Sequence, residues 1–262
     1  MVSDQRKGQY ALVVDDNRVN RRVAVAMLKR IGYTDIVEAE DGLQALERVK
    51  SGGFDLILMD CEMPIMDGFE STRQIRQWES ESQRSAALII ALTARVMAGD
   101  QQRCLDAGMN EYITKPLGYE QLQALVRREA DNRDAPSAVS PVDDEVQAVN
   151  DERYEKMCSL LREGVEEFYR DYLAVTWEKI NDIQSHPDMP LAKSARLIHS
   201  IRGSAGNVGA NQLYQLAEKL EHRLEYGETD VLYQQVGQLR MVLDRLEVEI
   251  GRRLDDANGE IL

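Results

Sequence analysis

The sequence predicts two folds in succession: a five-stranded parallel α/β sheet covered by helices on both faces, then an antiparallel four-helix bundle. Three observations support this fold class. Residues 1–130 alternate short apolar runs with amphipathic stretches, as βαβ units do. Residues 151–262 show helical periodicity throughout. Residues 131–150 contain two prolines and little apolar periodicity, so they are expected to form a linker between two domains, 1–130 and 151–262.

Five apolar runs in the first domain predict its strands. Four of them cover residues 10–14, 55–59, 87–92 and 112–114, and residues 36–37 begin the remaining one. Helices are expected after Asn17 and after Asp41, whose side chains can cap a helix N-terminus, and the first helix should end at Gly32. Another helix over 119–128 closes the domain. Because three of the runs are continuously apolar, both faces of the sheet should be buried.

The second domain divides into five helical stretches. Their expected ranges are 152–162, 164–185, 190–208, 211–226 and 229–254, separated by Gly164, by Pro187 and Pro190, by Gly209 and by Gly227. Successive helices joined by short connections pack antiparallel. We therefore expect a bundle with a short leading helix.

Charge and composition exclude several kinds of protein. The net charge is −14, and residues 131–262 hold 26 acidic and only 15 basic side chains, which argues against a nucleic-acid surface. No apolar run approaches the length of a membrane span, and residues 3–8 are polar, unlike a secretion signal. Three widely spaced cysteines predict neither a disulfide framework nor a zinc site. A cytoplasmic protein is expected.

Polar side chains follow the predicted strands at the point where each strand ends. They are Asp15, Asp16, Asp60, Thr93 and Lys115. In an open α/β sheet these strand ends meet at one edge, where ligands bind. Clustered carboxylates repel one another unless a cation holds them, and Mg²⁺ suits a site with few carboxylates. With a metal bound, one carboxylate could attack phosphorus. Taken singly, each aspartate could equally be a helix cap.

Four runs at these positions carry a resemblance. VVDDN (13–17), LMDCEMPIMDG (58–68), ALTA (91–94) and ITKP (113–116) resemble the receiver domain of two-component response regulators, over about residues 8–130. The resemblance implies a flavodoxin-like fold with Asp60 as the phosphoacceptor. It implies that Mg²⁺ is held by Asp15, Asp16, Asp60 and the backbone carbonyl of Glu62.

The same resemblance assigns further roles. Thr93 and Lys115 would contact the phosphoryl group, and Thr93 would act with Tyr112 as the switch that reports phosphorylation. Alternatively, Tyr112 could simply be a packing residue. The peptide bond that precedes Pro116 would be cis.

Of the three histidines, at positions 186, 199 and 222, His199 has informative neighbours. On a helix, Ile198 and Ile201 fall on the core side. His199, Gly203 and Gly206 fall on the other side, with Arg202 beside them. Each glycine within a helix lowers helix stability by about 1 kcal/mol relative to alanine. The expected benefit of these glycines is space for a partner protein to approach the imidazole closely. We expect an exposed imidazole that can act as a nucleophile. The alternative is an ordinary exposed histidine near a helix end.

The run HSIRGSAGNVGA (199–210) resembles histidine-containing phosphotransfer (HPt) domains, with a weaker match over about 150–255. The resemblance implies that His199 is phosphorylated and that Arg202 and Gly203 support it.

Both resemblances together predict a two-component phosphorelay protein. It would accept phosphoryl groups on Asp60, with Mg²⁺, and on His199, and pass them between a sensor histidine kinase and a downstream response regulator. No GxGxxG or P-loop pattern occurs, so kinase activity of its own is not expected. The alternatives are a phosphorylation-switched binding module and a phosphate sink without onward transfer. The hypothesis of an aspartate-nucleophile phosphatase is weaker, because such enzymes usually carry a DxD motif after the first strand, where this sequence has adjacent Asp15 and Asp16. Direct exchange between Asp60 and His199, and the oligomeric state, stay open.

Overall fold

The computed structural model describes residues 10–93, 100–131, 149–162, 164–226 and 232–259. The chain divides into two compact units, Met1–Val139 and Ser140–Leu262, and each is described by itself. Most of the expected linker 131–150 lies outside the described residues, as does the expected break at Gly227.

The first unit contains a parallel sheet in the order β2-β1-β3-β4-β5, which confirms the predicted α/β class. Its strands are β1 (Tyr10–Val14), β2 (Asp35–Ala39), β3 (Leu56–Asp60), β4 (Leu88–Thr93) and β5 (Glu111–Thr114). All of β3 is buried, as its continuous apolar run predicts. β2 starts at Asp35, one residue before the expected start at Ile36, and it is an edge strand in which Asp35 and Glu38 are exposed.

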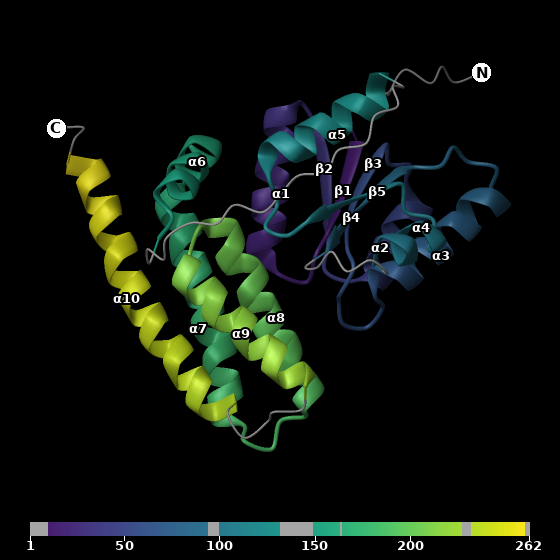
Figure 1. Ribbon diagram of the computed structural model, residues 1–262. Helices are drawn as coiled ribbons and strands as arrows, with labels where there is room; N and C mark the ends of the chain where they lie inside the picture. Colours follow the sequence, from purple (N-terminus) through teal and green to yellow (C-terminus); the bar gives the residue numbers. More distant parts are fainter. Residues whose placement is uncertain (1–9, 94–99, 132–148, 163, 227–231, 260–262) are drawn as a thin grey trace. The chain divides into compact units, whose positions relative to one another are not determined.

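Helices cover both faces of this sheet. They are α1 (Arg18–Ile31), α2 (Gly42–Ser51), α3 (Gly68–Glu81), α4 (Asp100–Asp106) and α5 (Tyr119–Asp131). Figure 1 shows α1 and α5 on one face and α2, α3 and α4 on the other. The expected helix caps form. The side chain of Asn17 accepts a hydrogen bond from a backbone N–H of α1 at 2.9 Å, and the side chain of Asp41 accepts one from a backbone N–H of α2 at 2.9 Å. The sequence reasoning assigned no range to α3, which Asp67 caps by accepting the Glu70 N–H at 2.7 Å.

The loop between β3 and α3 is packed tightly at the carboxyl edge of the sheet. A Cβ atom on Gly68 would lie 2.1 Å from the carbonyl oxygen of Asp60, so only glycine fits there. The Gly42 N–H donates to the Met66 carbonyl at 3.0 Å, which ties the start of α2 to this loop. Ile65 has a φ of 69°, a strained conformation for a β-branched residue. The close packing of Gly68 against Asp60 and the hydrogen bond from Gly42 to Met66 therefore both restrict the backbone that follows Asp60.

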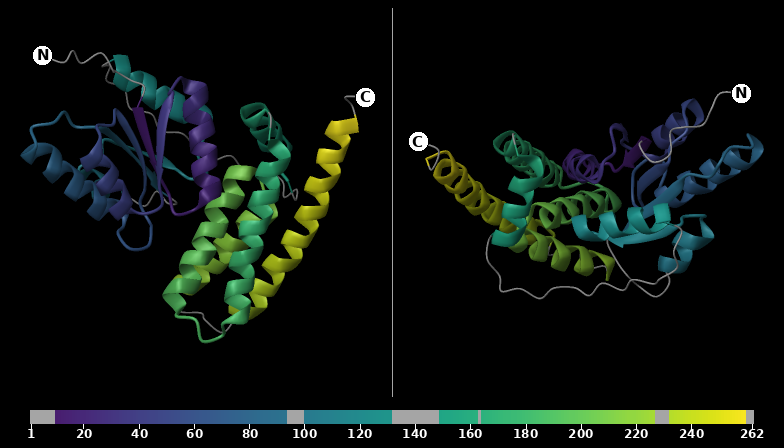
Figure 2. Two further views of the ribbon diagram at one scale, coloured as in Figure 1. Left: turned by 180° about the vertical axis from the view of Figure 1, so that it is seen from behind. Right: turned by 90° about the horizontal axis from the view of Figure 1, so that it is seen from above.

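The second unit is helical, as predicted. Its helices are α6 (Asp151–Leu161), α7 (Val165–Ser185), α8 (Leu191–Val208), α9 (Asn211–Glu225) and α10 (Leu232–Gly259). Contacts run from α7 to α8, α8 to α9, α9 to α10 and α10 back to α7, which closes a four-helix bundle, and the short leading α6 packs on α7 and α8 (Figures 1 and 2). α10 continues to Gly259, past the expected end at residue 254, because exposed polar residues such as Asp255 and Asp256 do not interrupt a helix.

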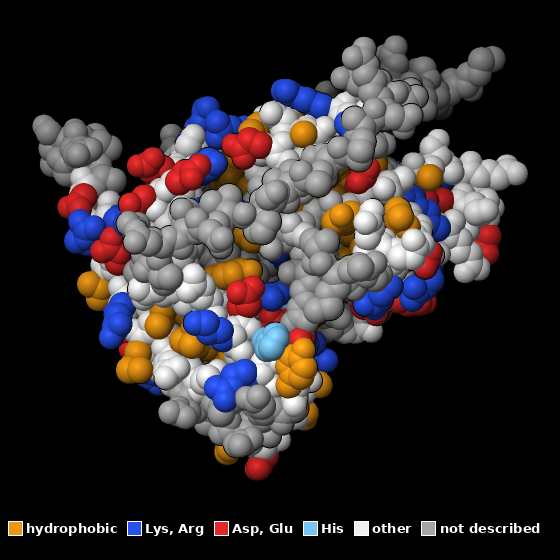
Figure 3. Space-filling model, in the orientation of Figure 1, with side chains coloured by type: hydrophobic (Ala, Val, Ile, Leu, Met, Phe, Trp, Pro, Cys, Tyr) orange, Lys and Arg blue, Asp and Glu red, His pale blue; other side chains and the backbone are white. Residues whose placement is uncertain are grey.

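Aromatic and branched aliphatic side chains fill the bundle. Phe168, Tyr169 and Tyr172 on α7 are buried together with Ile198 and Ile201 on α8. Among the described helices, none combines the length and apolar character that a membrane crossing requires. Over the described residues on the face drawn in Figure 3, basic and acidic side chains are interspersed.

Candidate functional site

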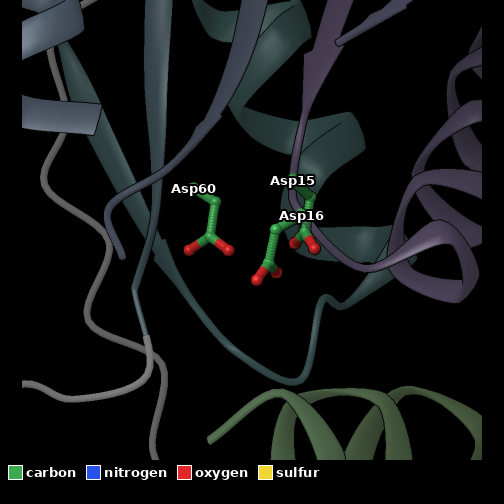
Figure 4. Close-up of side chains that lie close together, drawn as sticks. All are labelled: Asp15, Asp16 and Asp60. Carbon is green, nitrogen blue, oxygen red and sulfur yellow. The ribbon is translucent and has the colours of Figure 1, made fainter. Parts of the chain in front are cut away.

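Strand register brings the predicted polar residues of the first unit to one edge of the sheet. Val14 pairs with Met59, Asp60 pairs with Leu92, and Thr93 pairs with Thr114. The residues that end or follow these strands are Asp15, Asp16, Asp60, Thr93 and Lys115. Figure 4 shows the carboxylates of Asp15, Asp16 and Asp60 close together, although Asp60 comes from a different strand.

Lys115 joins the two buried carboxylates of this cluster. Its Nζ atom lies 2.9 Å from Oδ2 of Asp15 and 2.7 Å from Oδ2 of Asp60, and its side chain is 7% exposed. Burial alone would lower the pKa of Lys115, but attraction to Asp15 and Asp60 and the hydrogen bonds to both outweigh it, so this pKa is raised. The ammonium group therefore stays charged at neutral pH and offsets part of the acidic charge.

The carboxylate of Asp15 is held by several donors. The backbone N–H of Asn17 donates to Oδ1 at 2.8 Å, and Nδ2 of Asn20 lies 3.1 Å from Oδ1 and 3.2 Å from Oδ2. Asp15 is 1% exposed, whereas Asp16 beside it is exposed. The two adjacent aspartates thus offer one fixed and one solvent-facing carboxylate.

The three carboxylates form a donor set that a hard divalent cation fits. One oxygen from each of Asp15, Asp16 and Asp60 lies within 4.8 Å of the others. All three are oxygen ligands of the kind that Mg²⁺ prefers. The Glu62 N–H donates to Oδ1 of Asp60 at 3.3 Å, which holds the start of the loop against the carboxylate. The role of the Glu62 carbonyl as a ligand stays a prediction.

Thr93, Tyr112 and Pro116 lie near the same edge. Thr93 is 9% exposed, and its carbonyl accepts the Lys115 N–H at 2.7 Å. Tyr112 is partly buried against the core of the sheet, and the Lys115–Pro116 peptide is cis. The switch roles of Thr93 and Tyr112 stay predictions.

His199 in the second unit belongs to a three-residue polar cluster between α8 and α9. Its Nδ1 lies 2.8 Å from Oε1 of Glu221, whose Oε2 lies 2.9 Å from Nη1 of Arg202. Glu221 and Arg202 are buried. One carboxylate therefore contacts both the imidazole and the guanidinium, and it lies on the Nδ1 side of the ring. The role of His199 as a phosphoryl acceptor stays a prediction.

The expectation of an open helical face around His199 is wrong. The imidazole side chain is only 12% exposed, and Arg202, Gly203 and Gly206 are buried. Within the unit, Nη1 of Arg153 on α6 donates to the Gly206 carbonyl at 2.9 Å, and Oε1 of Glu221 on α9 lies 2.8 Å from Nδ1 of His199. Gly206 thus supports a helix contact, where the sequence reasoning expected clearance for a partner.

The other two histidines lie on the surface. His186 contacts Asp182 at 3.0 Å, and the ring of His222 lies 4.8 Å from that of Tyr226.

Sequence reasoning missed Glu221, Asn20 and Arg21. Glu221 follows Ala217 by four residues and precedes Leu224 by three, so it lies on the same buried face of α9 as these apolar residues. An acidic residue on an apolar helix face is the sequence signal that could have identified it. Asn20 and Arg21 lie between buried Val19 and Val23. Polar residues at such positions need partners, and the nearby strand-end carboxylates are candidates.

Comparisons with known proteins match both units. A family model described as a response regulator receiver domain matches residues 11–127, and one described as an Hpt domain matches residues 155–249. The signal transduction histidine-protein kinase BarA of Shigella flexneri is 32% identical over 86% of this chain and 25% of its own length. The sensor protein GacS of Pseudomonas syringae pv. syringae is 42% identical over 44% of this chain and 13% of its own length.

Solved structures give similar matches to the first unit. The receiver domain of sensor histidine kinase PA1611 from Pseudomonas aeruginosa PAO1, crystallised with a magnesium ion in its active site cleft, is 43% identical. The match covers 46% of this chain and 96% of that one, with a TM-score of 0.41. The chain spans no more than about a quarter of the length of the curated relatives named above.

Proposed function

Because the chain consists of a response regulator receiver domain followed by an Hpt domain, we propose that it carries phosphoryl groups in a two-component phosphorelay on two side chains, Asp60 and His199. One observation carries the proposal: each domain holds its reactive side chain against a charged partner, Lys115 for Asp60 and Glu221 for His199.

In the first domain Asp60 is the nucleophile. A carboxylate oxygen attacks the phosphorus of a donor phosphohistidine, so that an O–P bond forms while the N–P bond breaks and its electron pair stays on the donor imidazole. Lys115, already 2.7 Å from Asp60, is placed to neutralise negative charge, and Thr93 supplies a hydroxyl at the same edge. Mg²⁺, held by Asp15, Asp16 and Asp60 with the Glu62 carbonyl, would stabilise charge on the phosphoryl oxygens.

In the second domain His199 is the nucleophile. Nε2 attacks the phosphorus of an aspartyl phosphate, so that an N–P bond forms, the O–P bond breaks and the carboxylate leaves. Glu221 accepts a hydrogen bond from the Nδ1–H group, in the tautomer that leaves the lone pair on Nε2. Arg202, held by the same carboxylate, and Gly203, one residue further on, support the site.

The partners proposed are a sensor histidine kinase, as donor, and a downstream response regulator, as acceptor. Named relatives are sensor kinases, and another similar solved structure is a co-crystal of the histidine phosphotransfer protein Ypd1 with the receiver domain of Ssk1 from Saccharomyces cerevisiae. The reaction would take place in the cytoplasm, without a kinase activity of the chain itself.

Labelling tests the two assignments. The full chain is incubated with a ³²P-labelled phosphohistidine donor to test Asp60 and, separately, with a ³²P-labelled receiver domain carrying aspartyl phosphate to test His199. Asp60→Asn, His199→Gln and, as a matched control, exposed His222→Gln are treated in the same way, and each chain is separated from its donor before counting. Alkali-labile aspartyl phosphate should vanish in Asp60→Asn, alkali-stable phosphohistidine should vanish in His199→Gln, and His222→Gln should match the wild type. Chelating Mg²⁺ should stop Asp60 labelling but leave preformed phosphohistidine intact.

Two outcomes contradict the proposal. Equal labelling of both site variants would show that both assignments are wrong. If phosphohistidine never forms with any donor while Asp60 is labelled, the chain is a phosphorylation-switched binding module instead.

A further inference from the structure

Asn20, in the first turn of α1, contacts the carboxylate of Asp15. Its Nδ2 lies 3.1 and 3.2 Å from the two oxygens of Asp15, and Asn20 is 6% exposed. A buried amide donor shared between both carboxylate oxygens restricts rotation of the group about its Cβ–Cγ bond.

Arg21, the next residue, holds the backbone of the same aspartate. Its Nη1 donates to the Asp15 carbonyl at 2.9 Å, while Nε and Nη2 bind Glu38 at 3.0 Å and Glu40 at 2.8 Å. The guanidinium side chain is 7% exposed. The Asp15 carbonyl belongs to the peptide bond that leads to Asp16, so Arg21 fixes the orientation of one acidic residue relative to the other.

We propose that Asn20 and Arg21 are positioning residues that set the affinity of the Asp15–Asp16–Asp60 cluster for divalent cations. This inference rests on the proposed function of the first domain. Three like charges are costly to bring together, and a cation gains most when their geometry is fixed before it arrives. Asn20 fixes the side chain and Arg21 the main chain of the same residue, and neither is itself placed among the metal ligands. Groups that orient ligands typically change metal affinity by about 10-fold to 100-fold when removed.

The test measures Mg²⁺ binding by the full chain directly, by isothermal titration calorimetry with MgCl₂ alone. Asn20→Ala removes the amide donor, Arg21→Lys keeps the positive charge but loses the fork geometry, and Lys29→Ala on the exposed face of α1 is the control. We expect the dissociation constant for Mg²⁺ to rise about tenfold or more in Asn20→Ala and Arg21→Lys and to stay unchanged in Lys29→Ala. The rate of Asp60 phosphorylation by acetyl phosphate should recover at saturating Mg²⁺.

Thermal melting separates positioning from folding. A variant that melts cooperatively but binds Mg²⁺ with wild-type affinity overturns the inference, because a merely structural residue lowers the melting temperature alone. If Arg21→Lys fails to fold, Asn20→Ala decides the result. Failure of the wild-type chain to bind Mg²⁺ or to label at Asp60 would instead contradict the proposed function.

Discussion

A single carboxylate, Glu221, organises the histidine site. It lies 2.8 Å from Nδ1 of His199 and 2.9 Å from Nη1 of Arg202, and both side chains that it contacts are largely buried. Hydrogen bonds to charged groups contribute about 1.5–3 kcal/mol, so this carboxylate should matter to the reactivity of His199 and to the stability of the bundle.

Replacing Glu221 should therefore slow phosphorylation of His199. We expect Glu221→Ala to lower the rate of transfer from a phosphorylated receiver domain by roughly 10-fold to 100-fold, because the imidazole is no longer held with Nε2 as the nucleophile. Glu221→Gln, which keeps an acceptor oxygen, should lose less. Exposed Glu218→Gln on the same helix is the control. A folded Glu221→Ala protein with the wild-type rate would show that the contact is structural only.

At the scale of elements, the tight turn from β3 into α3 fixes Asp60. Gly68→Ala would place a Cβ atom 2.1 Å from the Asp60 carbonyl oxygen, so the loop must shift. We expect a loss of about 1–3 kcal/mol in the free energy of unfolding, measured by urea denaturation, together with slower Asp60 labelling. Gly118→Ala, whose Cβ atom would meet only ordinary contacts at 3.7 Å or more, should change neither. Unchanged stability in Gly68→Ala would show that the loop adapts freely.

Most elements could be predicted because their signals are local. Continuous apolar runs found β3 and β4, and Gly209, which caps α8 with a φ of 80°, was visible as a break. The strand-end cluster was predictable because parallel strands share an edge. Glu221 and the partial burial of His199 could not be predicted, because they depend on how α6 and α9 pack on α8, which no periodicity within α8 encodes.

At the scale of the molecule, the chain consists of two compact units, each with its own core. We therefore expect residues 1–139 and 140–262, expressed separately, each to fold and melt cooperatively by circular dichroism. The first fragment should be labelled at Asp60 by acetyl phosphate and lose this labelling with EDTA. The second should accept label at His199 from a phosphorylated receiver domain. A fragment that is unfolded alone would show that the units depend on each other.

The two reactive sites can form at different times during synthesis, because their residues are separated by different lengths of chain. Asp15 and Lys115 are 100 residues apart, whereas His199 and Glu221 are 22 apart on neighbouring helices. Contacts between residues far apart in the sequence form late, because closing a long loop costs conformational entropy before any stabilising contact is made. On the ribosome the aspartate pocket is incomplete until its fifth strand has emerged, while the histidine and its carboxylate can meet as soon as one helical hairpin is made.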